Sequence, residues 1–135
     1  MNKLETLKER LGAAADVGAA LALLEWDQQT YMPSKGAGAR ASQIATLSEI
    51  AHRMFTDPEV GALINDLQAE NLDADDAKMV GEAAYFYERA TKLPASFVQE
   101  MAAETSKGFE AWVAARKASD FAAFRPNVER IMEEH

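Results

Sequence analysis

Apolar residues recur at alternating intervals of three and four along almost the whole chain, which is the pattern of helices that bury one face. The first stripe runs from Leu4 to Leu21 and continues through Leu24 and Tyr31 to Pro33, where proline ends a helix. No useful length of chain alternates with a period of two, and no Asn-Gly or Asp-Gly hairpin turn occurs. The chain is therefore predicted to be all-α, with about six helices in an antiparallel array or bundle.

Turn and capping residues divide this pattern into helices. Residues 34–38 form a predicted turn before the second helix, which runs to about Met54. The third helix starts within residues 56–59 (TDPE): either the aspartate caps it with proline at the first position, or the threonine and glutamate form a capping box. The predicted starts of the last three helices are Asp73 with Asp75 and Asp76, then Pro94, and then Ser119-Asp120 as a cap.

The same periodicity predicts which side chains point inward. In the fifth helix the predicted inward stripe is Phe97, Met101, Thr105, Gly108 and Trp112. In the sixth helix it is Phe121, Phe124, Val128 and Ile131.

Length, charge and cysteine content limit the class of protein. A chain of 135 residues is the size of one domain, so residues 1–135 are expected to form a single helical domain. The net charge of -8 excludes a basic stripe, so neither nucleic acid nor an anionic membrane is an expected partner. There is no cysteine, no signal core and no apolar run near the ~20 residues that span a bilayer. We therefore expect a cytoplasmic protein.

Histidine content restricts catalysis, because the chain has only His52 and His135. A zincin helix needs two histidines at i and i+4, and His52 has no such partner. Glu49 and His52 form one Glu-x-x-His half-site, whereas a di-iron centre needs two half-sites. The favoured interpretation of this pair is a polar helix face. A small metal-binding bundle built on Glu49 and His52 is a weaker hypothesis, which ranks third after the two given at the end of this subsection.

For the acidic and aromatic residues, a catalytic or binding role is compared with a structural role. Asp75 and Asp76 point about 100° apart on a helix, so capping explains them better than acid–base catalysis. Trp26, between Glu25 and Asp27, is expected to complete the core, with a binding surface as the alternative. In the aromatic run of residues 85–87, two rings are expected to face the core and the third to meet another element or a partner chain. No residue set assembles a catalytic site.

Several phrases occur in the order of a known family. They are residues 24–33 (LEWDQQTYMP), 38–47 (GARASQIATL) and 87–94 (YERATKLP), followed by Thr105-Ser106, Ala111-Trp112, Ala115-Arg116 and the pattern Asp120-Phe121-x-x-Phe124-x-Pro126. Together they resemble the N-terminal region of the carboxypeptidase Taq family of thermostable zinc metallocarboxypeptidases.

The resemblance implies a mainly helical enzyme of about 500 residues, commonly a homodimer, which removes C-terminal residues from peptides. In that family a His-Glu-x-x-His helix and a downstream glutamate hold zinc or another divalent metal, whose bound water attacks the peptide carbonyl. The N-terminal helices form part of the wall of a deep substrate cleft. No position of this chain matches a metal or catalytic residue of the family, so none is carried over.

The leading hypothesis is therefore the N-terminal helical domain of a metallocarboxypeptidase, inactive alone. Its last helix reaches Glu133-Glu134-His135 without a stop signal, which suggests a chain cut from something longer. Its expected partners are the remainder of the enzyme or another copy of itself. The alternative is a free-standing helical interaction module without enzymatic activity.

Overall fold

The computed structural model describes residues 1–133, and every regular element in that range is helical. The α-helices are α1 (Lys3–Thr30), α2 (Ala37–Phe55), α3 (Pro58–Gln68), α4 (Ala74–Ala90), α5 (Ala95–Ala118) and α6 (Arg125–Glu133). Two short 3-10 turns, η1 (Ser34–Gly36) and η2 (Phe121–Ala123), precede α2 and α6. The all-α prediction is confirmed. Within residues 1–133, no helix is both long enough and apolar enough to cross a membrane.

Local capping explains where α3 and α4 begin. The Asp57 side chain accepts a hydrogen bond of 2.9 Å from the Glu59 backbone N–H, and Pro58 occupies the first helical position. The first of the two predicted starts for this helix is therefore correct. Asp73 caps α4 in the same way, accepting from the Asp76 N–H at 2.9 Å. Each cap satisfies a backbone donor that has no partner inside its helix.

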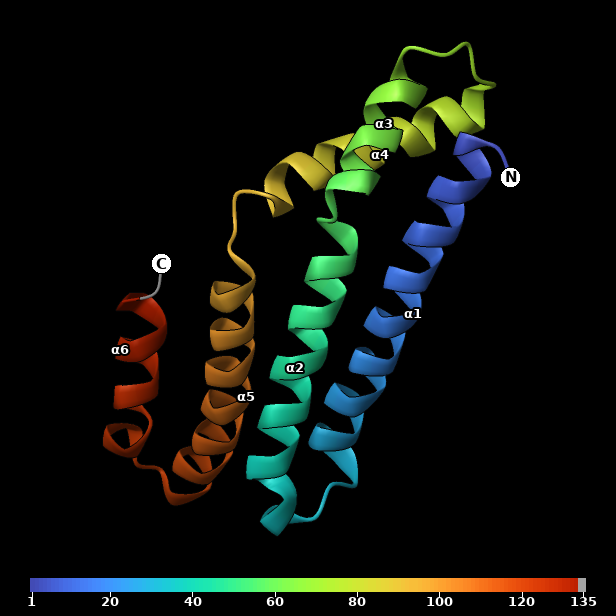
Figure 1. Ribbon diagram of the computed structural model, residues 1–135. Coiled ribbons are helices and arrows are strands. Elements are labelled where there is room, and N and C mark those ends of the chain that lie inside the picture. Colours follow the sequence, from blue (N-terminus) through green and yellow to red (C-terminus); the bar gives the residue numbers. More distant parts are fainter. Residues whose placement is uncertain (134–135) are drawn as a thin grey trace.

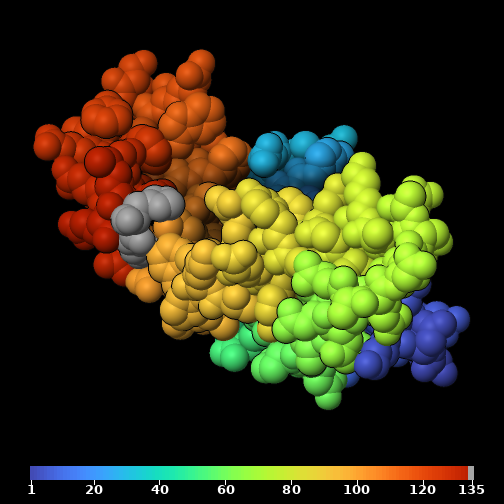
Figure 2. Space-filling model, turned by 90° about the horizontal axis from the view of Figure 1, so that it is seen from above, coloured from blue at the N-terminus to red at the C-terminus, as the bar shows by residue number. Residues whose placement is uncertain are grey.

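Helices α1, α2, α5 and α6 run side by side with alternating direction, and α3 and α4 lie above the upper ends of α1 and α2 (Figure 1). Helix α2 has the most extensive contacts, with α5 and with α1, while α6 packs on α5. Helices α3 and α4 pack on each other, and α3 also contacts α1. Seen from above, α3 and α4 cover the middle of the molecule, with α5 and α6 at one side (Figure 2).

The buried apolar core lies at the upper end. It joins the start of α1 to α3 and α4, and its members are Leu7, Val60, Ile64, Leu67, Val80 and Ala83. The contacts of α2 are different, because its buried residues are Ala41, Ile44 and Ala45. Two of these, Ala41 and Ala45, are small side chains, which let helix axes approach closely but bury little apolar area. The lower part of the molecule is therefore a close-packed helical array with a thin interior.

The predicted inward stripe of α5 is wrong at two positions. Thr105 and Trp112 are exposed, whereas Ser106, Gly108 and Ala115 are buried. Gly108 faces α6, since a Cβ built there would lie 3.5 Å from Ile131 Cδ1. Helix α5 packs against α2 on one side and α6 on another, so a single apolar stripe does not describe its contacts.

The predicted start of the last helix is also wrong. Ser119 ends α5 in the left-handed conformation, with φ 53°, and the Asp120 N–H donates to the Ala115 carbonyl at 2.9 Å. This is the hydrogen bond of a Schellman helix end, so Ser119-Asp120 stops one helix instead of capping the next. Phe121 then falls in η2 and is 66% exposed, against the prediction that it points inward.

Candidate functional site

The predicted half-site of Glu49 and His52 is engaged in contacts within the fold. The His52 ring nitrogen Nε2 lies 2.8 Å from the Leu93 carbonyl oxygen, which ties α2 to the connection before α5. Glu49 pairs with Arg53 one helical turn later, at 2.7 Å. Residues 1–133 contain no group of three or more histidine or acidic side chains that would hold a metal ion. Within that range, neither Glu49 nor His52 lies in such a group. The other histidine, His135, lies outside the described residues.

The acidic cluster at the start of α4 has a structural role. Asp76 pairs with Lys8 of α1 at 2.7 Å, and this hydrogen bond raises the pKa of Lys8. The backbone hydrogen bond from Asp76 lowers the pKa of Asp73, because it stabilises the ionised carboxylate. The carboxylates of this turn therefore serve the helix start and its contact with α1.

Trp26 does not complete the core, which corrects the structural interpretation given above. Its side chain is 54% exposed, and its ring packs against Tyr31 at a centroid distance of 5.6 Å. The reason is the register of α1, which turns the partly buried Asp27 and Gln28 inward instead. Trp26 is therefore a surface residue, and the alternative of a binding surface stays a prediction.

Two polar links, which we call the polar clamp, hold the lower end of α1. Arg40 of α2 donates to the Asp27 carboxylate at 2.9 Å and to the Leu24 carbonyl at 2.8 Å. Gln28 Nε2 donates to Ser106 Oγ of α5 at 2.9 Å and lies 3.3 Å from Glu110 Oε1. The sequence interpretation missed the clamp because it followed apolar residues only. Continuing the inward stripe past Leu24 by three and four residues reaches Asp27 and Gln28.

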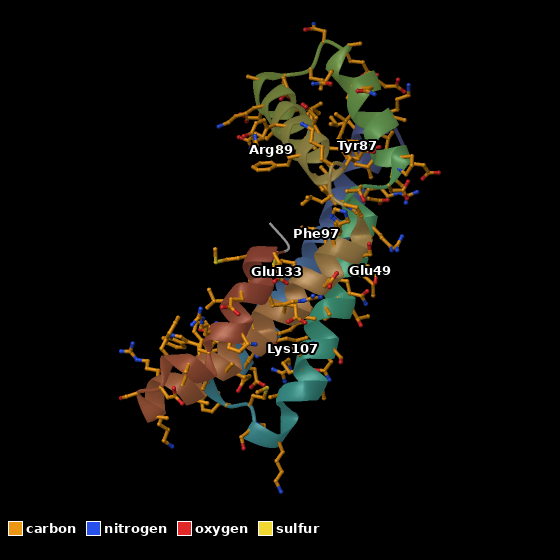
Figure 3. All side chains as sticks on the ribbon, turned by 90° about the vertical axis from the view of Figure 1, so that its left-hand side faces the viewer. Glu49, Tyr87, Arg89, Phe97, Lys107 and Glu133 are labelled. Atoms are coloured by element: carbon orange, nitrogen blue, oxygen red, sulfur yellow. The ribbon has the colours of Figure 1, made fainter. Side chains whose placement is uncertain are left out.

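The aromatic run of α4 also differs from its prediction. Only Tyr87 is partly buried, whereas Tyr85 and Phe86 are more than half exposed. Figure 3 labels Tyr87 and Arg89 on this helix, and the Arg89 guanidinium lies 4.8 Å from the centroid of the Tyr85 ring. Helix α4 packs mainly on α3, so one ring of the run faces the core and two remain at the surface.

The surface also carries two hollows beside α2. A groove of about 650 Å³ runs between α2 and α5, and its floor includes Ala41, Ala45 and Ala103. Its Glu104 and Lys107 pair with each other at 3.0 Å. A second hollow of about 510 Å³ lies between Leu24 of α1 and residues 42–47 of α2. Both hollows have mixed linings of apolar and polar side chains, which suit packing against another segment.

Known proteins are similar to this chain over nearly its whole length. The sequence pattern of the carboxypeptidase Taq (M32) metallopeptidases matches residues 6–135. Thermostable carboxypeptidase 1 of Thermus thermophilus is 34% identical over 114 residues, which are 82% of this chain and 22% of that relative. The crystal structure of BsuCP matches with a TM-score of 0.93 at 29% identity, and the M32 carboxypeptidase of Deinococcus radiodurans R1 with 0.75 at 33% identity. Both structural matches cover 99% of this chain and 27% of the solved chain.

The chain thus spans about a quarter of the length of the relatives that it matches. Its helices reproduce the backbone arrangement of a region inside a much longer polypeptide. The exposed apolar side chains and the two hollows belong to a fold that, in those relatives, continues into further structure.

Proposed function

Because this chain belongs to the carboxypeptidase Taq (M32) family of metallopeptidases, we propose that it is the N-terminal helical domain, residues 1–135, of a metal-dependent carboxypeptidase. The full enzyme removes C-terminal residues from peptides. The observation that carries the proposal is the family match over residues 6–135 of a chain that spans 22% of its Thermus relative.

Within that enzyme, this domain supplies no catalytic and no metal-binding residue. The internal contacts of Glu49 and His52 support this assignment, since both side chains are engaged within the fold. The remaining polypeptide holds zinc or another divalent metal, which polarises the peptide carbonyl and activates water. The helices described here form part of the wall around the substrate cleft, and the chain alone is inactive. The full enzyme is a homodimer of the cytoplasm.

A chimeric enzyme tests this proposal. The chain replaces the matching region of the Thermus carboxypeptidase, and release of C-terminal residues from N-blocked peptides is measured with and without a chelator. We expect hydrolysis that the chelator abolishes. The control is the Thermus enzyme without its matching region, for which we expect no release.

The alternative is a free-standing helical interaction module, and the exposed Trp26, Tyr85 and Phe86 are the observation that favours it. A chimera that folds, as judged by its helical circular dichroism, but releases no C-terminal residue would support this alternative over the proposed function. In that case the apolar side chains belong to a contact with a separate protein.

A further inference from the structure

The outward side of α1 is apolar over its middle and lower turns. We call this surface the α1 outer face, and its exposed members recur at helical spacing: Gly12, Ala15, Asp16, Ala19, Leu23 and Trp26. Leu23 is 63% exposed and Trp26 is 54% exposed. Asp16 is its only charged residue, and within residues 1–133 this carboxylate has neither an ion pair nor a hydrogen bond.

No other element of the described chain covers this face. Helix α1 packs against α2 and α3 through its opposite side, which carries Leu7, Leu11 and Leu21. Figure 2 shows the lower half of α1, in light blue, at the outline of the molecule. An apolar helix face of this length in water indicates a contact surface.

The total surface area agrees with a missing contact. The chain exposes 8748 Å², whereas a compact monomer of this mass exposes roughly 7,000 Å². A standard interface covers about 800 Å² on each partner. The surplus is therefore large enough for a stable contact on this face and for further contacts elsewhere.

Charge argues against a second copy as the occupant. Two chains of net charge -8 repel each other. Pairing two antiparallel α1 helices around Ala19 would also bring two Asp16 carboxylates into one apolar interface, each without a cation. An occupant that fits supplies small apolar side chains together with one positive charge.

We propose that the α1 outer face docks the remaining polypeptide of the full-length enzyme, which places a lysine or arginine against Asp16. This inference rests on the proposed function, in which the chain is part of a longer polypeptide. The length of the relatives supports that occupant, since about three quarters of each lies outside the match.

Cysteine labelling tests the docking, because the chain contains no cysteine of its own. Ala19→Cys places a thiol in the centre of the face, and Ala62→Cys, an exposed position on α3 near Glu59 and Asp66, is the matched control. Maleimide labelling of each is followed by mass spectrometry in the isolated chain and in the chimera with the Thermus enzyme. The measurement is repeated with cysteines at the two matching helix positions of the intact Thermus enzyme, which has no chimeric join.

We expect the Ala19→Cys thiol to react at least tenfold more slowly in the intact polypeptides than in the isolated chain, while Ala62→Cys reacts equally in both. Equal labelling of Ala19→Cys in every protein would overturn the docking. If the chimera still hydrolyses peptides in that case, the proposed function stands without it. Protection of Ala19→Cys in the isolated chain that grows with concentration would show a second copy on the face and also overturn the proposal.

The charge of the occupant has its own test. Asp16→Lys places a second cation against the expected lysine or arginine, so it should lower the melting temperature of the chimera and leave that of the isolated chain unchanged. Glu82→Lys, an exposed change on α4, is the control. An unchanged melting temperature of the Asp16→Lys chimera would contradict a cation at this position.

Discussion

At the scale of single residues, Tyr87 and Gly61 determine how α3 and α4 close on each other. The Tyr87 ring packs edge-on to Phe55 at 6.1 Å, and its hydroxyl lies 3.3 Å from the Asp57 carbonyl oxygen. A Cβ built on Gly61 would lie only 2.5 Å from the Tyr87 hydroxyl oxygen. Glycine is therefore required at Gly61 by this close approach.

Gly61→Ala should destabilise the chain by about 1–3 kcal/mol, because the Tyr87 ring must leave its position. Gly81→Ala is the matched control, since nothing lies within 4 Å of its built Cβ, and it should stabilise α4 by about 0.5–1 kcal/mol. Urea unfolding of both variants measures the difference. Equal effects of the two substitutions would show that Tyr87 does not restrict position 61.

The lowered pKa of Asp73 predicts that the stability of the chain depends on pH. Its folded pKa is lowered from 3.8 by the backbone hydrogen bond from Asp76, so its ionised form favours folding. This contribution is complete above pH 3.8 and is lost as the pH falls through the lower, folded pKa. Asp73→Asn keeps a cap but cannot titrate.

The urea midpoint of the unsubstituted chain should therefore fall more than that of Asp73→Asn when the pH is lowered from 6 towards 2. Lys78→Gln, at another exposed position of α4, is a control for the change of a surface charge. Parallel curves for the Asp73→Asn variant and the unsubstituted chain would contradict a cap that depends on the ionised carboxylate.

At the scale of elements, the sequence predicts helix starts well, because residues within one turn determine them. Aspartate before helical sequence sets the starts of α3 and α4, because a cap needs only residues within one turn. The inward faces are harder to predict, since they depend on which helices meet. Trp26 and Phe121 are at the surface because no described element packs over them. Following polar residues along the α1 stripe reaches Asp27 and Gln28 of the polar clamp, but their partners, Arg40 and Ser106, come from two other helices and cannot be read from that stripe.

The end of α5 gives a prediction of its own. Ser119 holds a left-handed conformation, which disfavours residues with a Cβ by roughly 1–2 kcal/mol. Ser119→Gly should therefore raise the free energy of unfolding by about 1 kcal/mol, whereas Ser119→Val should lower it. Thermal unfolding of the two variants measures these changes in stability. A loss of stability in Ser119→Gly would show that the serine side chain stabilises this turn.

The polar clamp predicts a second effect between elements. Asp27→Asn removes the charge that neutralises Arg40, whose side chain is only 15% exposed, and should destabilise the chain by about 1–2 kcal/mol. Glu88→Gln breaks an exposed pair with Lys92 and should change stability by less than about 0.5 kcal/mol. Urea unfolding compares them, and equal small effects would mean that the clamp does not stabilise the contact of α1 with α2.

At the scale of the whole molecule, the described helices pack around separate features instead of one site. The cluster of buried apolar side chains around Leu7 lies at the upper end, and the buried residues of α2 lower down are Ala41, Ile44 and Ala45. The polar clamp adds hydrogen bonds between the lower helices. Of the titratable residues that suggested a site, Glu49 pairs with Arg53 and His52 contacts the Leu93 carbonyl oxygen. What remains is exposed apolar surface and two hollows beside α2, which are features of a domain that packs against more protein.

The most direct test of this account is a metal-binding and activity measurement on the isolated chain. Zn²⁺ is titrated by equilibrium dialysis, and release of C-terminal residues from N-blocked peptides is followed in the same samples. We expect no stoichiometric binding and no release above the blank, because the proposed function assigns the metal and its chemistry to the remaining polypeptide. One equivalent of bound Zn²⁺ together with release that a chelator abolishes would contradict the account.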